Sequence, residues 1–154
     1  RALFEFLELP DRVADPAVPR SVPRRGDLEV QDISFHYPGT GALVLDRVSM
    51  RLPEGAFVAI VGANGSGKST LIKMLCRFYD PDSGAVRWAG TDVREYGQAE
   101  YRRRIGALFQ DFVCFDTDVT ENIRYGDVGL APDSSRIRQA AAAAVARDRA
   151  SRTG

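Results

Sequence analysis

Residues 62–70 read Gly-Ala-Asn-Gly-Ser-Gly-Lys-Ser-Thr, a glycine-rich stretch that ends in a lysine and two hydroxyl side chains. This order fits the phosphate-binding pattern G-x-x-x-x-G-K-[ST] over Gly62–Ser69. A triphosphate needs a loop without bulky side chains, so that backbone N–H groups can converge on its oxygens. Lys68 would add a full positive charge, and the Ser69 hydroxyl would be one ligand of Mg²⁺. The stretch therefore predicts a site for a nucleoside triphosphate.

The segments on either side of this loop predict the strand and the helix that would position it. Residues 56–61 form a short, continuously apolar run, as expected of a parallel strand that is buried on both faces. After the loop, apolar side chains recur at helical spacing until Asp80–Gly84 stops the helix. The helix begins at about Ser66 or Gly67, so its unpaired N–H groups and positive dipole end would point at the phosphates. The alternative is a glycine-rich turn without a ligand, although a turn has no use for the lysine and serine that end it.

Length and charge exclude several classes of protein. The chain has 154 residues, enough for one core, and its 21 lysines and arginines equal its 21 acidic residues. No net field would therefore draw it to nucleic acid, and we interpret the arginines at 102–104 as a solvated helix face. Cys76 and Cys114 lie far apart without a metal-ligand pattern, so we interpret both as packing residues of a reducing compartment. No apolar run approaches the ~20 residues of a membrane-spanning helix.

The amino-terminal region differs in composition from the rest of the chain. The sequence begins at Arg1 rather than at a methionine, so we interpret it as part of something longer. Residues 2–9 would be the last turns of a helix, and residues 10–25 contain four prolines and many charges. The pattern predicts a linker over residues 1–26 and one partial domain over residues 27–154.

Hydrophobic spacing and turn signals predict the remaining elements of the domain. Two antiparallel strands and a further short strand would form a sheet, a second apolar strand would end at Gln110, and three helices would complete the chain. Asp118 and Glu121 have the spacing of a capping box, and Asp133 or Ser134 would cap the last helix. In chain order, the strands are expected at 28–37, 43–52, 85–89 and 105–109, and the helices near 99–104, after 118 and through 140–144.

With these motifs in view, the chain resembles the nucleotide-binding domain of ATP-binding cassette (ABC) transporters. The form of the loop over Gly62–Thr70 is similar to that family's own version of the phosphate-binding motif. Phe35-His36-Tyr37-Pro38 resembles its aromatic A-loop, and Phe109-Gln110-Asp111 resembles its Q-loop. The resemblance implies an α/β fold: a P-loop NTPase core, here incomplete, with an antiparallel β subdomain on its N-terminal side.

The same resemblance implies a set of site residues. Tyr37 would stack on the adenine ring of ATP, while Gln110 would reach Mg²⁺ and the attacking water. Lys68 and Gln110 would be the catalytic residues, and Ser69 and Gln110 the metal ligands. The phosphates would be bound by the whole motif: Gly62, Ala63, Asn64, Gly65, Ser66, Gly67, Lys68, Ser69 and Thr70. Without the resemblance, Tyr37 would be a strand-end aromatic residue and Gln110 an ordinary polar edge residue.

The parent protein implied by the resemblance is an ATPase that couples ATP binding and hydrolysis to transport across a membrane. The linker and the Val119–Ile123 segment resemble exporter-type members, in which that segment contacts the membrane domain. The implied partners are ATP, a membrane domain and a second nucleotide-binding domain in a head-to-tail dimer, without nucleic acid. The implied location is the cytoplasmic face of the cell membrane.

Several parts of the family's pattern do not occur in this sequence. After Gln110 there is no LSGGQ-like signature, no apolar strand ending in Asp-Glu and no switch histidine. Residues 42–46 imitate the aspartate-ending strand but lie upstream of the phosphate loop, so we reject them as a catalytic strand. We therefore expect a truncated or frame-shifted piece that binds nucleotide weakly at best. The alternatives are a small phosphate-loop kinase and a non-catalytic fragment that docks on a membrane domain through residues 111–125.

Overall fold

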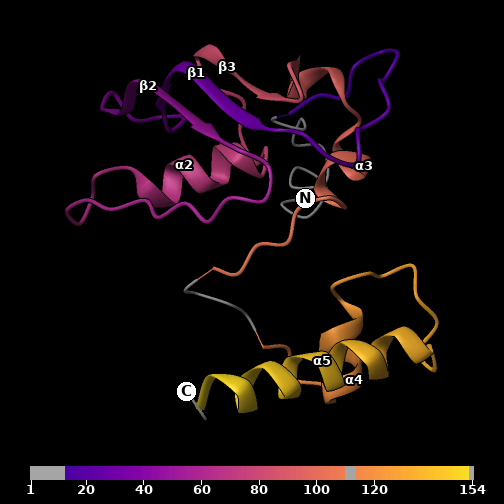
Figure 1. Cartoon of the computed structure of the whole chain (residues 1–154). Helices are drawn as coiled ribbons and strands as arrows, with labels where there is room; N and C mark the ends of the chain where they lie inside the picture. The colour runs from indigo at the N-terminus through magenta and orange to yellow at the C-terminus, as the bar shows by residue number, and fades with distance from the viewer. Residues whose placement is uncertain (1–12, 110–113, 153–154) are drawn as a thin grey trace, which may run out of the picture. The chain divides into compact units, whose positions relative to one another are not determined.

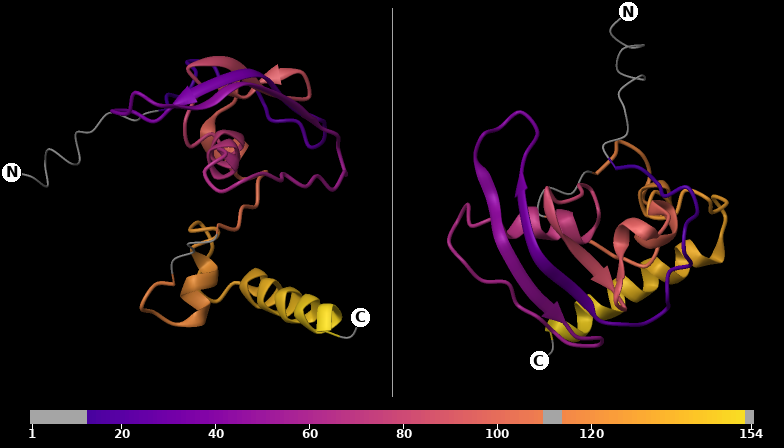
Figure 2. Two further views of the ribbon diagram at one scale, coloured as in Figure 1. Left: turned by 90° about the vertical axis from the view of Figure 1, so that its left-hand side faces the viewer. Right: turned by 90° about the horizontal axis from the view of Figure 1, so that it is seen from above.

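An antiparallel sheet of four strands is the framework of the first of two compact units. The computed structural model describes residues 13–109 and 114–152, and the first unit runs to Ala107. Its strands lie in the order β2-β1-β3-β4, so the first strand is central, as Figures 1 and 2 show. Their bounds are Leu28–His36 for β1, Leu43–Leu52 for β2, Ser83–Trp88 for β3 and Thr91–Asp92 for β4.

The expected hairpin and third strand are confirmed. β1 pairs with β2 from Leu28↔Leu52 to His36↔Leu43, and with β3 from Leu28↔Trp88 to Ser34↔Ser83. The register shifts within β1, where Asp32 takes a positive φ of 54° and its N–H donates to Ser49 Oγ at 2.9 Å. This hydroxyl satisfies a backbone donor that the irregular ladder leaves unpaired.

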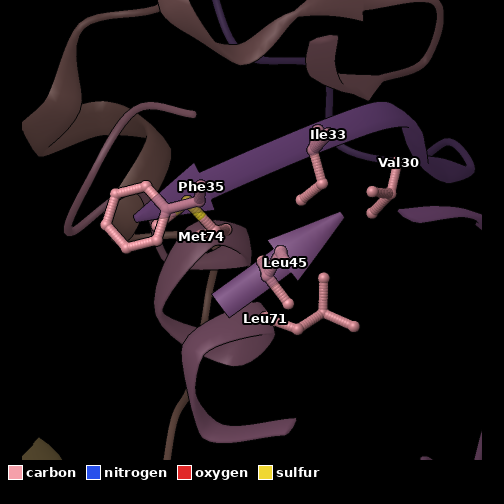
Figure 3. Close-up of a cluster of buried hydrophobic side chains, with 6 residues drawn as sticks. All are labelled: Val30, Ile33, Phe35, Leu45, Leu71 and Met74. Atoms are coloured by element: carbon pink, nitrogen blue, oxygen red, sulfur yellow. The ribbon is translucent and has the colours of Figure 1, made fainter. Parts of the chain in front are cut away.

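Helix α2 (Lys68–Leu75) packs against one face of the sheet. Leu71 and Met74 enter a buried cluster with apolar side chains of β1 and β2, which Figure 3 shows. The complete cluster is Val30, Ile33, Phe35, Leu45, Leu71 and Met74. The helix begins where it was expected, but it ends at Leu75, so the predicted end at Asp80–Gly84 was wrong. Its burial holds the end of the phosphate loop against the sheet.

A second buried cluster lies beside β3. It joins Val86 to the 3-10 turn η1 (Val93–Glu95), to Tyr101 of α3 (Gln98–Arg102) and to Val22. Helix α3 confirms the helix expected near 99–104. The second cluster reaches back to the amino-terminal part of the chain through Val22.

The described residues before β1 are irregular and pack against the sheet unit. We call residues 13–22 the N-terminal strap. Val13 and Val22 are buried, Arg20 forms a parallel bridge with Tyr96, and the Arg20 N–H donates to Glu95 O at 2.8 Å. The lack of regular secondary structure agrees with the proline-rich composition, and the buried valines anchor this segment to the domain. The boundary at residue 27 stays a prediction.

Two strands expected from apolar runs do not form, and those predictions were wrong. Residues 56–61 and 105–109 are irregular, and neither pairs with a strand among the described residues. Phe57 is 108% exposed and Val61 is 88% exposed, instead of being buried on both faces. A parallel strand is stable only when neighbouring strands take its N–H and C=O groups and helices cover it. The described part of the chain provides no such neighbour for either run.

The second unit contains helices α4 (Val119–Arg124) and α5 (Ser135–Arg152). The capping expected at Asp118 is confirmed, because its Oδ1 accepts from the Glu121 N–H at 2.8 Å. Ser134 rather than Asp133 caps α5, since its Oγ accepts from the Arg136 N–H at 3.3 Å. None of the helices in the described ranges combines the length and the apolar character needed to span a membrane.

Candidate nucleotide-binding site

The phosphate loop is an open turn that leads directly into α2. Residues 61–66 are exposed, and the Ser66 N–H donates to Ala63 O at 3.2 Å, which closes the turn. The first helical hydrogen bond follows, from the Leu71 N–H to Gly67 O at 2.8 Å. No side chain caps the start of the helix, and its first turn contains no acidic residue. Unpaired N–H groups and the positive end of the helix dipole therefore face the loop, an arrangement that suits an anion.

Gly67 makes the junction between loop and helix possible. Its φ is +85°, in the left-handed region that favours glycine. A Cβ at this position would lie 2.8 Å from Leu45 Cδ2 and 2.9 Å from Val44 O. The second glycine of the pattern is thus required by close packing against β2, in addition to any contact with phosphate.

The Lys68 side chain folds back over the loop. Its Nζ donates to Gly62 O at 2.8 Å and to Ala63 O at 2.7 Å, and it lies 3.4 Å from Ser66 Oγ. These bonds hold the ammonium group above the loop, where a phosphate oxygen could take the place of a carbonyl. The single formal charge at the start of α2 is therefore placed for an anionic ligand.

Tyr37 lies next to the helix that carries the phosphate loop. Its hydroxyl is 3.1 Å from the buried Thr70 Oγ1, and its ring meets Phe35 and Tyr79 edge to face at centroid distances of 5.1 and 5.4 Å. Lys73 Nζ is 5.7 Å from the centre of the Tyr37 ring. The structure thus brings together Tyr37 and the loop, which are 25 or more residues apart in the sequence.

Ser69 and Gln110 were the expected metal ligands. Ser69 lies in the first turn of α2 with an exposed side chain, so its hydroxyl fits one position in an octahedral set of oxygen ligands around Mg²⁺. Nucleotide phosphates would supply other positions. Gln110 lies outside the described residues. Within the described ranges, no group of three or more His, Cys, Asp or Glu side chains is placed to hold a metal ion.

The carboxyl end of α2 is fixed by side chains of α3. Tyr101 Oη donates to Leu75 O at 2.6 Å, and Arg102 Nη2 donates to Arg77 O at 2.6 Å. Burial, together with the nearby Cys76, raises the pKa of Tyr101 far above its usual range, so the phenol stays a donor. These bonds satisfy carbonyls that the helix leaves unpaired, and the arginine complements the negative end of its dipole.

Sequence reasoning missed four residues around Tyr37. Lys73 and Tyr79 contact its ring, Thr40 Oγ1 donates to its carbonyl oxygen at 2.7 Å, and Asp82 holds the preceding residue. Lys73 and Tyr79 could have been suspected from their spacing on and after the helix. Asp82 could not, because it belongs to a stretch whose evident role is to stop the helix.

Comparison with known proteins gives one family. The model of the ABC transporter family matches residues 45–153. An ATP-dependent lipid A-core flippase of Pseudomonas fluorescens is 41% identical over 96% of this chain and 24% of its own length. The mitochondrial iron-sulfur clusters transporter atm1 of Neurospora crassa is 41% identical over 83% of this chain and 18% of its own length.

A solved structure agrees with these relatives. A bacterial Atm1-family ABC exporter with ATP bound has a TM-score of 0.73 and 34% identity, covering 81% of this chain and 22% of that one. The chain thus spans about a quarter or less of the relatives that it matches. The expected fold class, a partial P-loop NTPase with an antiparallel subdomain, is confirmed by these matches and by the sheet. The chain belongs to the ABC transporter family.

Proposed function

We propose that this chain is the ATP-binding part of an exporter-type ABC transporter. Tyr37 would stack on adenine, the loop from Gly62 to Thr70 would bind the phosphates, and Ser69 would hold Mg²⁺ together with Gln110. Gln110 would also orient the attacking water, with Lys68 stabilising the charge that develops on the phosphates. The parent would couple ATP hydrolysis to export, with a membrane domain and a second nucleotide-binding domain as partners, at the cytoplasmic face of the membrane.

One observation carries this proposal: the aromatic residue and the phosphate loop meet on one helix. The Tyr37 hydroxyl contacts Thr70, which directly follows the proposed metal ligand Ser69. An aromatic ring and an anion-binding helix start, held together by α2, match the two chemically different ends of a nucleotide. The exporter relatives support the direction of transport, while nothing in these residues specifies the cargo.

The proposal is tested by titrating the chain with MgATP, MgGTP and inorganic magnesium triphosphate. Lys68→Ala should weaken all three ligands by at least about tenfold, because the lost charge acts on phosphate. Tyr37→Ala should weaken ATP and GTP unequally and change inorganic triphosphate much less, because the ring would stack on the base while only the hydroxyl touches the phosphate-binding motif, at Thr70. Arg47→Ala, a substitution at an exposed position of β2, is the control. Unchanged ATP binding in both site variants would refute the assignment.

A second candidate is nucleotide binding without turnover by this chain. The sequence after Gln110 lacks an apolar strand that ends in Asp-Glu, and phosphoryl transfer to water needs such a metal-holding carboxylate. The chain would then bind MgATP and release no phosphate above the background of Lys68→Ala. Phosphate release that depends on Lys68 would instead favour ATP hydrolysis by this chain.

A further inference from the structure

The end of β1 is tied to the segment after α2 by one carboxylate. Asp82 Oδ2 accepts from the His36 backbone N–H at 2.8 Å and lies 2.7 Å from His36 Nδ1. The Asp82 N–H donates in turn to Ser34 O at 2.9 Å. Three contacts thus connect two residues of β1, Ser34 and His36, to a single residue after α2.

The backbone around Asp82 is built for this close approach. Gly84 has a φ of +79°, and a Cβ there would lie 2.4 Å from Gln31 O and 2.5 Å from Asp32 O. No other residue type fits without moving β1, so the turn after α2 is seated directly on the strand. Asp82 is therefore held in place by backbone packing and not only by its own side chain.

His36 immediately precedes Tyr37, so the contact between Asp82 and His36 affects the position of Tyr37. The direction in which the Tyr37 side chain leaves the strand depends on the backbone of His36, where the regular strand ends. On the other side, Thr40 fixes the Tyr37 carbonyl oxygen through its N–H and its hydroxyl, at 3.0 and 2.7 Å. The aromatic residue is thus held from both sides along the chain, by Asp82 and by Thr40.

Asp82 contacts β1 at Ser34 and His36, next to Tyr37. It lines a hollow of about 380 Å³ together with Phe35, His36, Pro38, Tyr79 and Asp80, and Tyr37 is not among the lining residues. We therefore expect an effect of Asp82 that is specific to the base to pass through His36 and Tyr37, and an effect of its charge alone to change all phosphate ligands alike.

We propose that Asp82 is a positioning residue for adenine recognition: through His36 it sets the orientation of Tyr37, and thereby selects adenine nucleotides over ligands that have only phosphates. This inference rests on the proposed function, because it requires Tyr37 to meet the base. It adds to that function a determinant of affinity at the end of β1, outside the phosphate loop. His36, interpreted from the sequence as a plain strand residue, is the link between the two.

The test compares MgATP with inorganic magnesium triphosphate, which has the phosphates and lacks the base. In Asp82→Ala, the dissociation constant for MgATP should rise about threefold to tenfold, the expected effect of losing hydrogen bonds that hold the aromatic residue. The dissociation constant for triphosphate should stay within about twofold of its wild-type value. His36→Ala keeps the backbone N–H, so it should show a smaller shift of the same kind. Asp82→Asn keeps one acceptor and should fall between wild type and Asp82→Ala.

Asp80→Ala is the matched control for charge. Asp80 lines the same hollow, but its carboxylate faces Arg77 at 3.3 Å instead of β1. Removing the negative charge of Asp80 should change the dissociation constants for MgATP and for triphosphate by the same factor. Thermal unfolding identifies variants that do not fold, and if Asp82→Ala is one of them, Asp82→Asn and His36→Ala provide the same comparison.

The possible outcomes distinguish the positioning role of Asp82 from the proposed nucleotide-binding function. Selective weakening of ATP in the Asp82 and His36 variants supports the inference. Equal weakening of ATP and triphosphate, or no weakening of either, overturns it while the nucleotide site stands. Wild-type chain that binds neither ligand refutes the proposed function, and the inference with it.

Discussion

Gly67 shows how one residue can serve both the fold and the site. The phosphate-binding pattern requires a glycine here to leave room for a ligand, whereas the structure gives a reason that needs no ligand. Its φ of +85° and the 2.9 Å approach of a would-be Cβ to Val44 O leave no space for a side chain. Gly67 therefore fixes the distance between the loop and the edge strand β2.

Gly67→Ala should lower the free energy of unfolding by about 3 kcal/mol, because a left-handed alanine and a steric overlap with β2 add together. Gly90→Ala is the control, since Gly90 has a similar φ of +79° with no heavy atom within 4 Å of a Cβ. It should cost only about 1 kcal/mol. The comparison is made by urea unfolding, and equal losses in the two variants would contradict the packing argument.

The two cysteines should differ sharply in reactivity. Cys76 is buried at the end of α2, and burial, only partly offset by the Arg102 guanidinium, raises the pKa of its thiol. Cys114 is exposed. At pH 8, iodoacetamide should modify Cys114 promptly and Cys76 only as fast as the unit opens, as followed by mass spectrometry of the peptides. Comparable rates at the two positions would show that the end of α2 is not packed as described.

The N-terminal strap is the element whose attachment the sequence least suggests. Arg77 is 1% exposed, and its guanidinium donates to Ala14 O and Tyr96 O, each at 2.8 Å. Gln98 adds a bond from its N–H to Asp15 Oδ1 at 2.7 Å. One buried cation thus joins the strap to the end of the helix that carries the phosphate loop.

Arg77→Met should lower the free energy of unfolding by about 2–4 kcal/mol, because it leaves buried carbonyl oxygens unpaired. Hydrogen exchange should accelerate most at the Arg20 amide, which bonds Glu95 O across the strap. Arg47→Met, at an exposed position of β2, should leave both quantities unchanged. Unaltered exchange in the strap of Arg77→Met would show that the arginine does not hold it.

Elements that depend on nearby residues were predictable from the sequence, and elements that depend on distant partners were not. The β1–β2 hairpin, α3 and the Asp118 cap follow from alternation, helical spacing and side-chain chemistry within a few residues. The apolar runs at 56–61 and 105–109 were misinterpreted because apolar composition indicates burial without identifying the partner. The contacts of the strap could not be predicted, because prolines favour an extended chain and indicate nothing about its contacts.

The residues of the candidate site also divide into those that the sequence predicted and those that it did not. The loop and Tyr37 were identified by residue type and order, and the structure places them together. The contact of Asp82 with His36 depends on how the turn after α2 is seated on β1, whereas Lys73 reaches the Tyr37 ring from α2 and Thr40 bonds the Tyr37 carbonyl within a local turn. No local pattern encodes that seating. The role of Gln110 remains a prediction.

For the molecule as a whole, the exposed apolar run at 56–61 should dominate behaviour in solution. Phe57 and Val61 face solvent, and exposed apolar segments promote association. Phe57→Asp should reduce concentration-dependent association in sedimentation velocity while changing the free energy of unfolding by less than about 0.5 kcal/mol. Leu45→Asp, which buries a charge in the core, should instead unfold the first unit. Unchanged association in Phe57→Asp would exclude this run as its cause.

The central claim is that MgATP binds at the start of α2, between the phosphate loop and Tyr37. The most direct measurement follows backbone amide chemical shifts of the isotopically labelled chain during titration with MgATP. The largest changes should fall on Gly65 to Thr70 and on Tyr37, and Lys68→Ala should abolish them. Shift changes confined to other segments, or the same changes in Lys68→Ala, would contradict the claim.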